Sequence, residues 1–393
     1  AGLEIQRLAL LLKGGRIQMK ILLLSCSTGE GHNHCALAAK EALEARGHEA
    51  EFLDMLHMFG NPGPLSFDKL LNTISTKAPE MFGLMYHAGE MYSATGVTSP
   101  VYLANIRHAG QLGEFIEKNG FDAVVCSHLF PMETLTYMRR RDAKFTVRCY
   151  GILSDYACIP FLKETALDRY FLPHEDVLGE CVLAGIPARR LCVTGMPVAH
   201  KFLEPMTQAE ARAQLGLPLE KKIYLVMTGG IGCGDAVTLC DSILRVPDED
   251  TLLCVLPGRN EELRAALQER YGAGGSVLAV PFTDKVAVYM HAADVLLSKA
   301  GGISSSEAAA LGVPLVHTMA IPGVETLNAQ FFAARGMSFF ARSADEAARF
   351  ADRLVYDRKA AARMLDAQRA HMKRDGAEEI VRRIERDADE TRT

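Results

Sequence analysis

The chain has 393 residues, of which 49% are hydrophobic and 23% are charged, the balance of a folded globular protein. This length exceeds one ordinary hydrophobic core, so two domains are expected. The formal net charge of −5 argues against general nucleic-acid binding, because that function needs a basic surface. The ten cysteines form no C-x-x-C pair and favour reduced, buried thiols of a cytosolic protein over a disulfide framework.

Residues 1–18 are expected to be an extension ahead of a natural start at Met19. Their apolar run, residues 8–12, is too short to span a bilayer and lacks the cleavage pattern of a signal peptide. The expected location is therefore cytoplasmic. Contact with the inner face of the cell membrane stays open, since a local patch can act against the overall charge.

Two segments begin in the same way and indicate two similar halves. Residues 20–25 (KILLLS) and 222–227 (KIYLVM) are continuous apolar runs, typical of strands buried on both faces of a parallel sheet. A glycine-bearing turn and a helical pattern follow each run. We therefore expect one domain over residues 19–197 and another over residues 198–393, with the linker at residues 195–198.

Further apolar runs alternate with helical patterns and predict an α/β fold with parallel sheets covered by helices. The predicted strands cover residues 123–127, 147–153, 252–256, 276–280, 295–298 and 315–317. From Asp345 onward the sequence is rich in alanine and charge at helical spacing. These last helices are expected to close the second half and to pack back across the first.

Three glycine-rich turns follow predicted strands. In an open parallel sheet, ligands bind beyond the carboxyl ends of the strands, where N–H groups at a helix start attract phosphate. The turns at residues 28–32 and 229–234 match neither the dinucleotide fingerprint G-x-G-x-x-G nor a P-loop. Each of them, taken singly, can equally be a tight connection.

The third turn, residues 299–308 (KAGGISSSEA), is more specific for a nucleotide. Gly301 and Gly302 allow close approach, and free N–H groups near Ser304 and Ser305 suit a diphosphate. Glu307 is expected in the first helical turn, where its carboxylate could accept hydrogen bonds from two ribose hydroxyls. The alternative is that Ser304 and Glu307 form a capping box.

The loop after the next predicted strand, residues 321–330, would lie beside the third turn at the same sheet edge. A carboxylate and an amide in this loop could contact sugar hydroxyls. The alternative is a polar helix start.

In this order, these segments resemble the glycosyltransferase family of monogalactosyldiacylglycerol synthases and bacterial processive diacylglycerol glucosyltransferases. The peptidoglycan N-acetylglucosaminyltransferase is a more distant relative. The likeness extends from about residue 20 to about residue 354. Eight colinear segments carry it: residues 22–32, 127–131, 139–141, 153–156, 195–198, 258–260, 298–308 and 323–328.

The resemblance implies the GT-B architecture, in which two Rossmann-like domains face each other across a cleft. It implies a UDP-sugar donor in the C-terminal domain and a lipid acceptor, diacylglycerol, in the N-terminal domain. By resemblance, the donor would be bound by residues of the second half. These are Phe282 and Thr283 at the uracil, Glu307 at the ribose, Gly302 and Ser304 at the diphosphate, Gly230 and Gly232 over the phosphates, Arg259 and Asn260 nearby, and Gly323, Glu325 and Asn328 at the sugar.

The reaction that the resemblance implies is an inverting transfer of a hexose. A base removes the proton of the acceptor hydroxyl while that oxygen attacks the anomeric carbon, and helix dipoles stabilise the leaving diphosphate. His32 occupies the family's Gly-x-Gly-His position and titrates near neutrality, which makes it the candidate base. Asp155 is expected to orient His32 or the acceptor. A solvated or capping histidine, and Asp155 as the base, stay open as alternatives.

Two departures from the family pattern bear on the substrate. Ser27 stands where the plant-type enzymes carry an acidic residue, and Val324 stands where the family's Gly-Gln-Glu has its amide. Because selectivity among sugars depends on such polar contacts, the identity of the sugar stays open. A UDP-N-acetylglucosamine epimerase and a non-catalytic sugar-nucleotide sensor are the competing functions.

Neither a cofactor nor a metal is expected. Residues 248–250 (DED) spell the D-x-D pattern of metal-dependent glycosyltransferases, but they precede a predicted strand and would lie at the sheet edge opposite the ligand site. They are interpreted as a solvated turn. The spacing of His and Cys does not indicate a zinc site.

An apolar stretch between residues 65 and 92 has two interpretations. Its members are Phe67, Leu70, Leu71, Ile74, Met81, Phe82, Leu84, Met85 and Tyr86. An amphipathic stretch with methionine and aromatic residues could lie in a lipid interface, although only Lys69 and Lys77 accompany it. A helix pair that caps the N-terminal core is the alternative.

Overall fold

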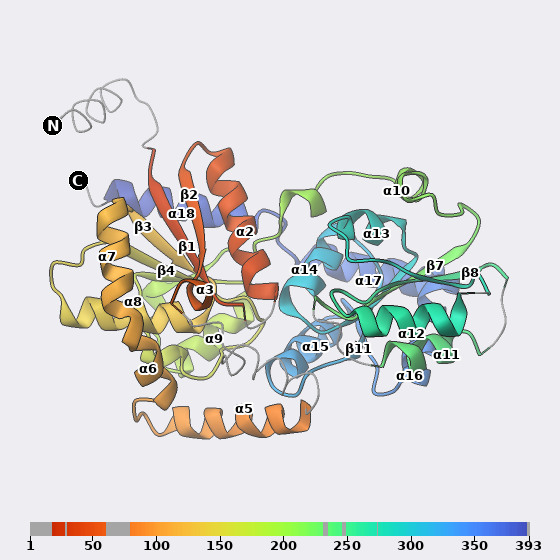
Figure 1. Cartoon of the computed structure of the whole chain (residues 1–393), viewed down its shortest axis with the longest axis horizontal. Helices are drawn as coiled ribbons and strands as arrows, with labels where there is room; N and C mark the ends of the chain where they lie inside the picture. The colour runs from red at the N-terminus through yellow and green to blue at the C-terminus, as the bar shows by residue number, and fades with distance from the viewer. Residues whose placement is uncertain are drawn as a thin grey trace.

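The structure is a computed structural model, and it describes residues 18–27, 30–59, 79–230, 235–245, 249–272 and 274–390. These residues form two six-stranded sheets in which every strand pairing is parallel. Helices cover the sheets, and the two halves lie side by side (Figure 1). This confirms the predicted α/β fold of two Rossmann-like domains.

The first sheet has the strand order β2-β1-β3-β4-β5-β6. Its strands are β1 (Lys20–Ser25), β2 (Glu49–Asp54), β3 (Ala123–Cys126), β4 (Arg148–Ile152), β5 (Arg169–Leu172) and β6 (Leu191–Val193). The side chains of β3 are all buried, and those of β1 are buried after its first residue. Because these strands are buried on both faces, their sequences are nearly continuous apolar runs.

The helices of the first half connect these strands. They are α2 (Glu30–Ala45), α3 (Met55–Phe59), α5 (Pro79–Ala94), α6 (Pro100–Asn105), α7 (Ala109–Asn119), α8 (Leu129–Arg141) and α9 (Glu175–Leu183). Short 3-10 turns are η1 (Ile106–His108), η2 (Leu162–Glu164), η3 (Ala188–Arg190) and, after the first sheet, η4 (His200–Phe202).

The second sheet has the order β12-β11-β10-β7-β8-β9. Its strands are β7 (Lys222–Met227), β8 (Thr251–Leu256), β9 (Val277–Ala279), β10 (Val295–Lys299), β11 (Leu315–Met319) and β12 (Phe339–Phe340). The remaining helices are α10 (Gln208–Leu215), α11 (Ala236–Ile243), α12 (Glu261–Tyr271), α13 (Val286–Ala292), α14 (Gly302–Leu311), α15 (Val324–Ala334), α16 (Ala344–Tyr356), α17 (Arg358–His371) and α18 (Gly376–Glu390).

Four strands have no counterpart among the predicted ones: β2, β5, β6 and β12. Strand β2 (EAEFLD) lies at a sheet edge and has only one buried residue, so polar and apolar side chains mix in it. Strands β6 and β12 are also edge strands and have three and two residues, too few for a periodic pattern. Strand β5 has only four residues and begins with an arginine.

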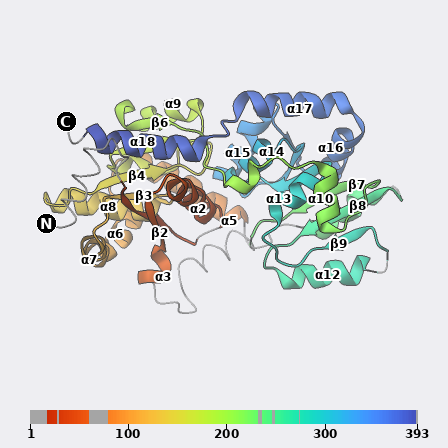
Figure 2. The ribbon, with the colours of Figure 1, turned by 90° about the horizontal axis from the view of Figure 1, so that it is seen from above.

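The last helix returns to the first half. Helix α18 lies over the first sheet, although α16 and α17 lie over the second (Figure 2). Its Glu385 binds Arg46, with an Nε–Oε1 distance of 3.0 Å, and His48 at 3.1 Å. Where the chain crosses back, an ideal Cβ on Gly376 would lie 2.4 Å from the carbonyl oxygen of Met196, so the two crossing segments pack backbone against backbone. The two halves are therefore joined at two crossings.

The carboxyl ends of the central strands of both sheets meet at the boundary between the halves. An ideal Cβ on Gly31, next to the start of α2, would lie 3.9 Å from Ile303 in the first turn of α14. Both helix starts follow strands in the interior of their sheets, β1 and β10. This is the position at which open parallel sheets bind ligands, so the candidate site is at this boundary.

Candidate functional site

The candidate base, His32, lies near the start of α2 and is half-buried. Its Nδ1 lies 3.0 Å from the carbonyl oxygen of Ser127 and 2.9 Å from Oγ of Ser154. Because a carbonyl only accepts, Nδ1 carries the proton and Nε2 is left as the proton acceptor. Burial lowers the pKa of His32 below 6.5, and the charge of Lys299 lowers it further, while Asp155 and the Ser127 carbonyl partly offset this. The imidazole is therefore neutral near pH 7, the state that a general base requires.

The carboxylate of Asp155 is coupled to His32 through Ser154. The Ser154 hydroxyl lies 3.3 Å from Oδ2 of Asp155 and 2.9 Å from His32 Nδ1. Sequence reasoning included Ser154 in a family segment but did not single it out. Its position between the two predicted residues makes it the link by which Asp155 can orient the imidazole.

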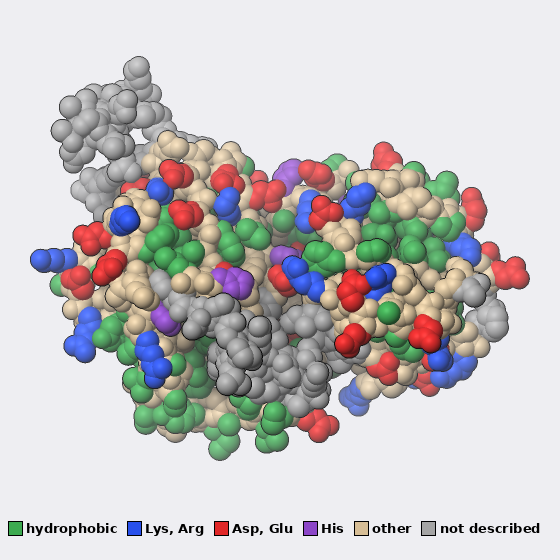
Figure 3. Space-filling model, viewed as in Figure 1, with side chains coloured by type: hydrophobic (Ala, Val, Ile, Leu, Met, Phe, Trp, Pro, Cys, Tyr) green, Lys and Arg blue, Asp and Glu red, His purple; other side chains and the backbone are tan. Residues whose placement is uncertain are grey.

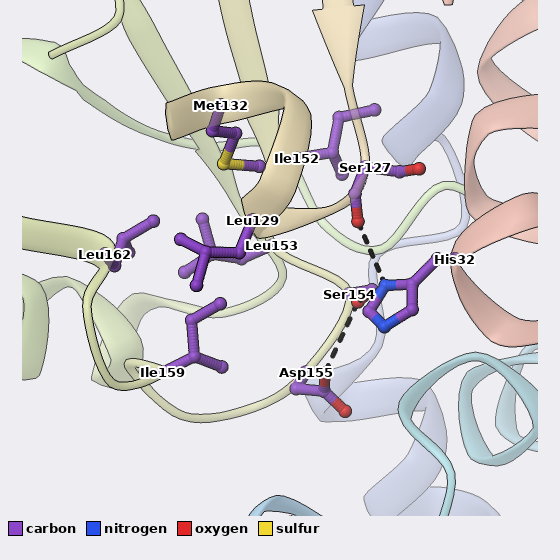
Figure 4. Close-up of a pocket in the computed structure, with 10 residues that line it drawn as sticks. All are labelled: His32, Ser127, Leu129, Met132, Ile152, Leu153, Ser154, Asp155, Ile159 and Leu162. Atoms are coloured by element: carbon purple, nitrogen blue, oxygen red, sulfur yellow. Dashed lines mark hydrogen bonds between the residues drawn. The ribbon is translucent and has the colours of Figure 1, made fainter. Parts of the chain in front are cut away.

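A small pocket, with room for little more than a water molecule, opens beside His32 (Figure 4). Ser127, Ser154 and Asp155 accompany His32 on its polar side. The opposite side is lined by six apolar side chains: Leu129, Met132, Ile152, Leu153, Ile159 and Leu162. An apolar wall with a few polar groups at one side suits contact with the hydroxyl-bearing end of an apolar ligand.

The start of α14 meets the first half directly. An ideal Cβ on Gly302 would lie 2.1 Å from the Ser154 carbonyl oxygen and 3.2 Å from Oδ1 of Asp155, so this position needs a glycine. Gly301 is the N-cap residue and provides no side-chain cap. Ser304 is the third residue of the helix, and its hydroxyl donates to the Gly301 carbonyl at 3.4 Å. The first-turn N–H groups can therefore receive an anion.

The capping-box alternative for this turn is wrong, and so is the expected place of Glu307. The helix begins at Gly302, so Ser304 is inside the helix rather than at its cap and Glu307 is in the second turn. The carboxyl group of Glu307 is buried, with 5% of the residue exposed. Burial raises its pKa to about 8, against a smaller opposing effect of Lys201. Glu307 is therefore largely protonated at neutral pH and can both donate and accept hydrogen bonds.

A second group of residues predicted to bind the UDP-sugar is in the loops after β7 and β8. The Arg259 N–H donates to the Gly230 carbonyl at 3.0 Å, which joins the two loops. The Arg259 guanidinium lies 4.4 Å from the ring centroid of Phe282 and 3.3 Å from the carboxylate of Glu30 in the first half. Glu30 also packs against Gly230. Gly232 lies outside the described residues.

Two other residues predicted to bind the UDP-sugar, Asn260 and Thr283, have side chains bonded to nearby backbone. Oδ1 of Asn260 accepts from the N–H of Leu263 at 2.9 Å and caps α12. Oγ1 of Thr283 accepts from the N–H of Lys285 at 3.1 Å. The side chains of Asn260 and Thr283 thus hold the backbone of their own loops, and these loops shape the site.

The predicted sugar loop is tied to the turn before α14. Gly323 is the N-cap of α15 and has a φ of +108°. Glu325 binds the ammonium group of Lys299 and accepts from the N–H of Ile321 at 3.1 Å. Lys299, which sequence reasoning did not single out, ends the buried strand β10 and so brings a positive charge to the edge where a diphosphate would bind.

Asn328 lies at the centre of the boundary and is completely buried. Its amide nitrogen donates to Oδ1 of Asp155 at 2.8 Å and to the carbonyl of Ala300 at 3.2 Å. Its oxygen accepts from the N–H of Tyr156 at 2.8 Å. The structure therefore gives Asn328 contacts that link the two halves, and brings it together with His32, Asp155 and Gly302.

The D-x-D segment lies away from this group. Glu249 and Asp250 directly precede β8, at the amino end of the strand, whereas Asp248 is outside the described residues. Across the described ranges, the structure brings together no group of three or more His, Cys, Asp or Glu side chains that could hold a metal ion.

Two known protein families match the two halves of the chain separately. Residues 32–198 match the monogalactosyldiacylglycerol (MGDG) synthase family, and residues 235–382 match the glycosyltransferase family 28 C-terminal domain. The processive diacylglycerol β-glucosyltransferase of Bacillus cytotoxicus is 26% identical over 367 residues, which are 92% of each chain. The enzyme of the same name from Bacillus subtilis is 24% identical over 331 residues, 83% of this chain and 84% of the relative.

Solved structures share the fold at low sequence identity. MurG of Acinetobacter baumannii superimposes with a TM-score of 0.60 at 15% identity, covering 94% of this chain and 99% of that one. The UDP-GlcNAc 2-epimerase of Neisseria meningitidis, bound to UDP-GlcNAc, has a TM-score of 0.58 at 14% identity, covering 93% and 99%. Because an epimerase shares this fold, the fold alone does not identify the activity. The first half of the chain thus matches the monogalactosyldiacylglycerol synthase family, the second half matches the glycosyltransferase family 28 C-terminal domain, and the chain as a whole is similar to processive diacylglycerol β-glucosyltransferases.

Proposed function

We propose that the protein is an inverting glycosyltransferase that moves a hexose from a UDP-sugar to diacylglycerol. The observation that carries the proposal is the setting of His32 beside the apolar pocket. Its Nδ1 is held by Ser127 and Ser154, and its Nε2 is the proton acceptor. The apolar side chains around the pocket would contact the lipid next to its hydroxyl, with that hydroxyl at the polar side near His32.

In the proposed reaction, Nε2 of His32 takes the proton of the acceptor hydroxyl. The acceptor oxygen forms a bond to the anomeric carbon as the bond from that carbon to the diphosphate oxygen breaks. UDP leaves with the electron pair, and the anomeric configuration is inverted. Asp155, acting through Ser154, would hold the imidazole in place and stabilise its protonated form.

The charge of the diphosphate would be met by groups of the second half. The uncapped start of α14 presents N–H groups, and Lys299, paired with Glu325, and Arg259, paired with Glu30, could turn toward the diphosphate from the same edge. With these groups in place, we propose that transfer requires neither a metal nor another cofactor. Glu307 would bind the ribose hydroxyls from its buried position.

Peripheral contact with the inner face of the membrane would use α5. The described helices include none that is both long enough and apolar enough to cross a bilayer. The outer stripe of α5, defined by Met81, Leu84, Met85 and Met91, is exposed, with Leu84 at 72% and Met91 at 75%. Figure 3 shows hydrophobic side chains along the edge of the molecule where α5 lies. The other apolar members of the predicted stretch, at positions 67 to 74, lie outside the described residues, as does the side chain of Phe82.

The test is incubation of the purified full chain with UDP-glucose, UDP-galactose or UDP-N-acetylglucosamine, with and without diacylglycerol vesicles. Mass spectrometry of the lipid and of the nucleotide sugar reads the outcome, and a parallel reaction contains EDTA. Glycolipid formed only with vesicles, and equally in EDTA, supports the proposal. Interconversion of the nucleotide sugar without lipid would instead identify an epimerase, and UDP binding without any product a sensor.

A further inference from the structure

Helix α5 has an inner face that is pinned to both halves of the chain. An ideal Cβ on Gly83 would lie 2.5 Å from Cβ of Pro322 in the second half. Near the other end of the helix, Oγ of Ser93 accepts from the N–H of Phe161 in the first half at 3.2 Å. Helix α5 therefore bridges the boundary, and Tyr86, which lies between these two contacts on the same face as Gly83, is turned to the interior.

Tyr86 is the large side chain on this inner face. An ideal Cβ on Gly323 would lie 2.7 Å from Cγ of Tyr86 and 3.0 and 3.1 Å from its two Cδ atoms, so the ring covers Gly323 where a side chain would otherwise be. Gly323 is the N-cap of α15, the helix that carries Glu325 and Asn328. The ring is therefore at the entrance of the proposed sugar site.

The hydroxyl of Tyr86 is buried and has no hydrogen-bond partner within the described part of the chain. A buried hydroxyl without a partner is unfavourable and uncommon in folded proteins. Burial raises the pKa of Tyr86, and the negative charges of Glu90 and Asp155 raise it further. The phenol thus keeps its proton and remains a hydrogen-bond donor close enough to Asp155 to feel its charge.

The residue that follows Gly323, at the start of α15, is apolar. Val324 carries no polar side-chain atom, so it offers nothing to a sugar hydroxyl at the start of α15. The Tyr86 ring that covers this turn carries an unpaired donor at its far end. The geometry points to Tyr86 as a residue that contacts the hexose of the UDP-sugar and helps to select it, through a hydrogen bond from the phenol to a sugar hydroxyl. This inference rests on the proposed sugar-transfer function.

The variant Tyr86→Phe tests whether the Tyr86 hydroxyl contacts the hexose, because it keeps the ring on Gly323 and removes only the oxygen. Calorimetry on the full chain would measure the Kd of UDP and the Kd of each UDP-hexose. Loss of one neutral hydrogen bond should weaken UDP-hexose binding by about three- to tenfold, and UDP, which has no hexose, should bind as before. The ratio between UDP-glucose and UDP-galactose should also change.

Tyr92→Phe is the matched control on the same helix, since the Tyr92 hydroxyl is bonded to the Thr98 carbonyl at 3.2 Å and lies on the exposed side. It should leave every Kd unchanged. Equal weakening of UDP and UDP-hexose by Tyr86→Phe would show a merely structural role, and unchanged binding of both would overturn the inference. These measurements need no turnover, so they are decided independently of whether the wild-type chain glycosylates diacylglycerol.

Discussion

The side-chain amide of Asn328 donates a 2.8 Å hydrogen bond to Oδ1 of Asp155 and so joins the two halves of the chain beside the candidate base. Asp155 is in the loop after β4, and Asn328 is on α15 of the second half. The same amide also holds the backbone of Ala300 and Tyr156. One buried side chain thus links the acceptor side directly to the donor side.

Asn328→Ala should lower the free energy of unfolding by about 2–3 kcal/mol, because it leaves buried polar groups without their partners. Urea unfolding measures this. Asn119→Ala is the control, since the Asn119 amide makes one bond of 2.8 Å, to the Phe115 carbonyl on the outer surface of α7. Its cost should stay below about 1 kcal/mol. Equal effects of the two substitutions would contradict the role of Asn328 as the link.

Gly302→Ala should reduce transfer by about 100-fold, because the new methyl group would press on the Ser154 carbonyl and push the halves apart. Steady-state kinetics with saturating donor and lipid would measure the loss. Gly179→Ala, at an exposed position of α9 where a Cβ meets nothing within 4 Å, should leave activity unchanged. A fully active Gly302→Ala variant would show that close approach of α14 is unnecessary.

The buried carboxyl group of Glu307 should make the free energy of unfolding depend on pH. Its folded-state pKa of about 8 lies above the ordinary value of 4.5, so its contribution to stability is complete below pH 4.5 and is lost as the pH rises through 8. Glu307→Gln cannot ionise, and its Tm should therefore rise relative to wild type between about pH 5 and pH 8.5. Differential scanning calorimetry across this range measures the change.

Glu133 provides the comparison, because burial also raises its pKa to about 8 while it lies on α8 of the first half. Glu133→Gln should show the same trend in Tm without any change in UDP affinity. Glu307→Gln should in addition weaken UDP binding by about tenfold, through loss of ribose contacts. UDP affinity unaffected by Glu307→Gln would rule out the ribose assignment.

Asp155→Asn should move the acid limb of the pH profile of kcat/KM to lower pH. His32 is active when unprotonated, so the rate falls as the pH drops through its pKa, which is already below 6.5. Removing the carboxylate charge removes an effect that raises this pKa, and the amide keeps an oxygen for Asn328. Rates measured from about pH 4.5 to 8 would show the shift. A limb that moves to higher pH would mean that Asp155 does not act on His32 in this way.

The fold was predictable where a single local property determines it. Strands β1, β3, β7 and β10 are buried on both faces, so their central residues are apolar, and the turns after β1, β7 and β10 shape the site. The edge strand β2 is mostly half-exposed, and its mixed sequence does not distinguish it from a loop.

The site was less predictable because its contacts join distant parts of the chain. Asp155 and Asn328 are 173 positions apart, and no periodic pattern can show that they meet. The start of α14 is not evident from the sequence, because Ser304 and Glu307 have the spacing of a capping box, whereas the backbone turns helical at Gly302. Tyr86 could be interpreted only as one member of an apolar stripe, since the sequence does not show which side of α5 packs on Gly323.

The most direct test of the proposed mechanism is the turnover of His32→Ala with a UDP-hexose and diacylglycerol vesicles, beside His34→Ala as a control from the same helix. Loss of a general base should lower kcat by about 100- to 10,000-fold while the Kd of UDP stays unchanged. His34→Ala, at an exposed position two residues away, should keep wild-type turnover. Wild-type kcat in His32→Ala would contradict the assignment of His32 as the base on which the proposed transfer depends.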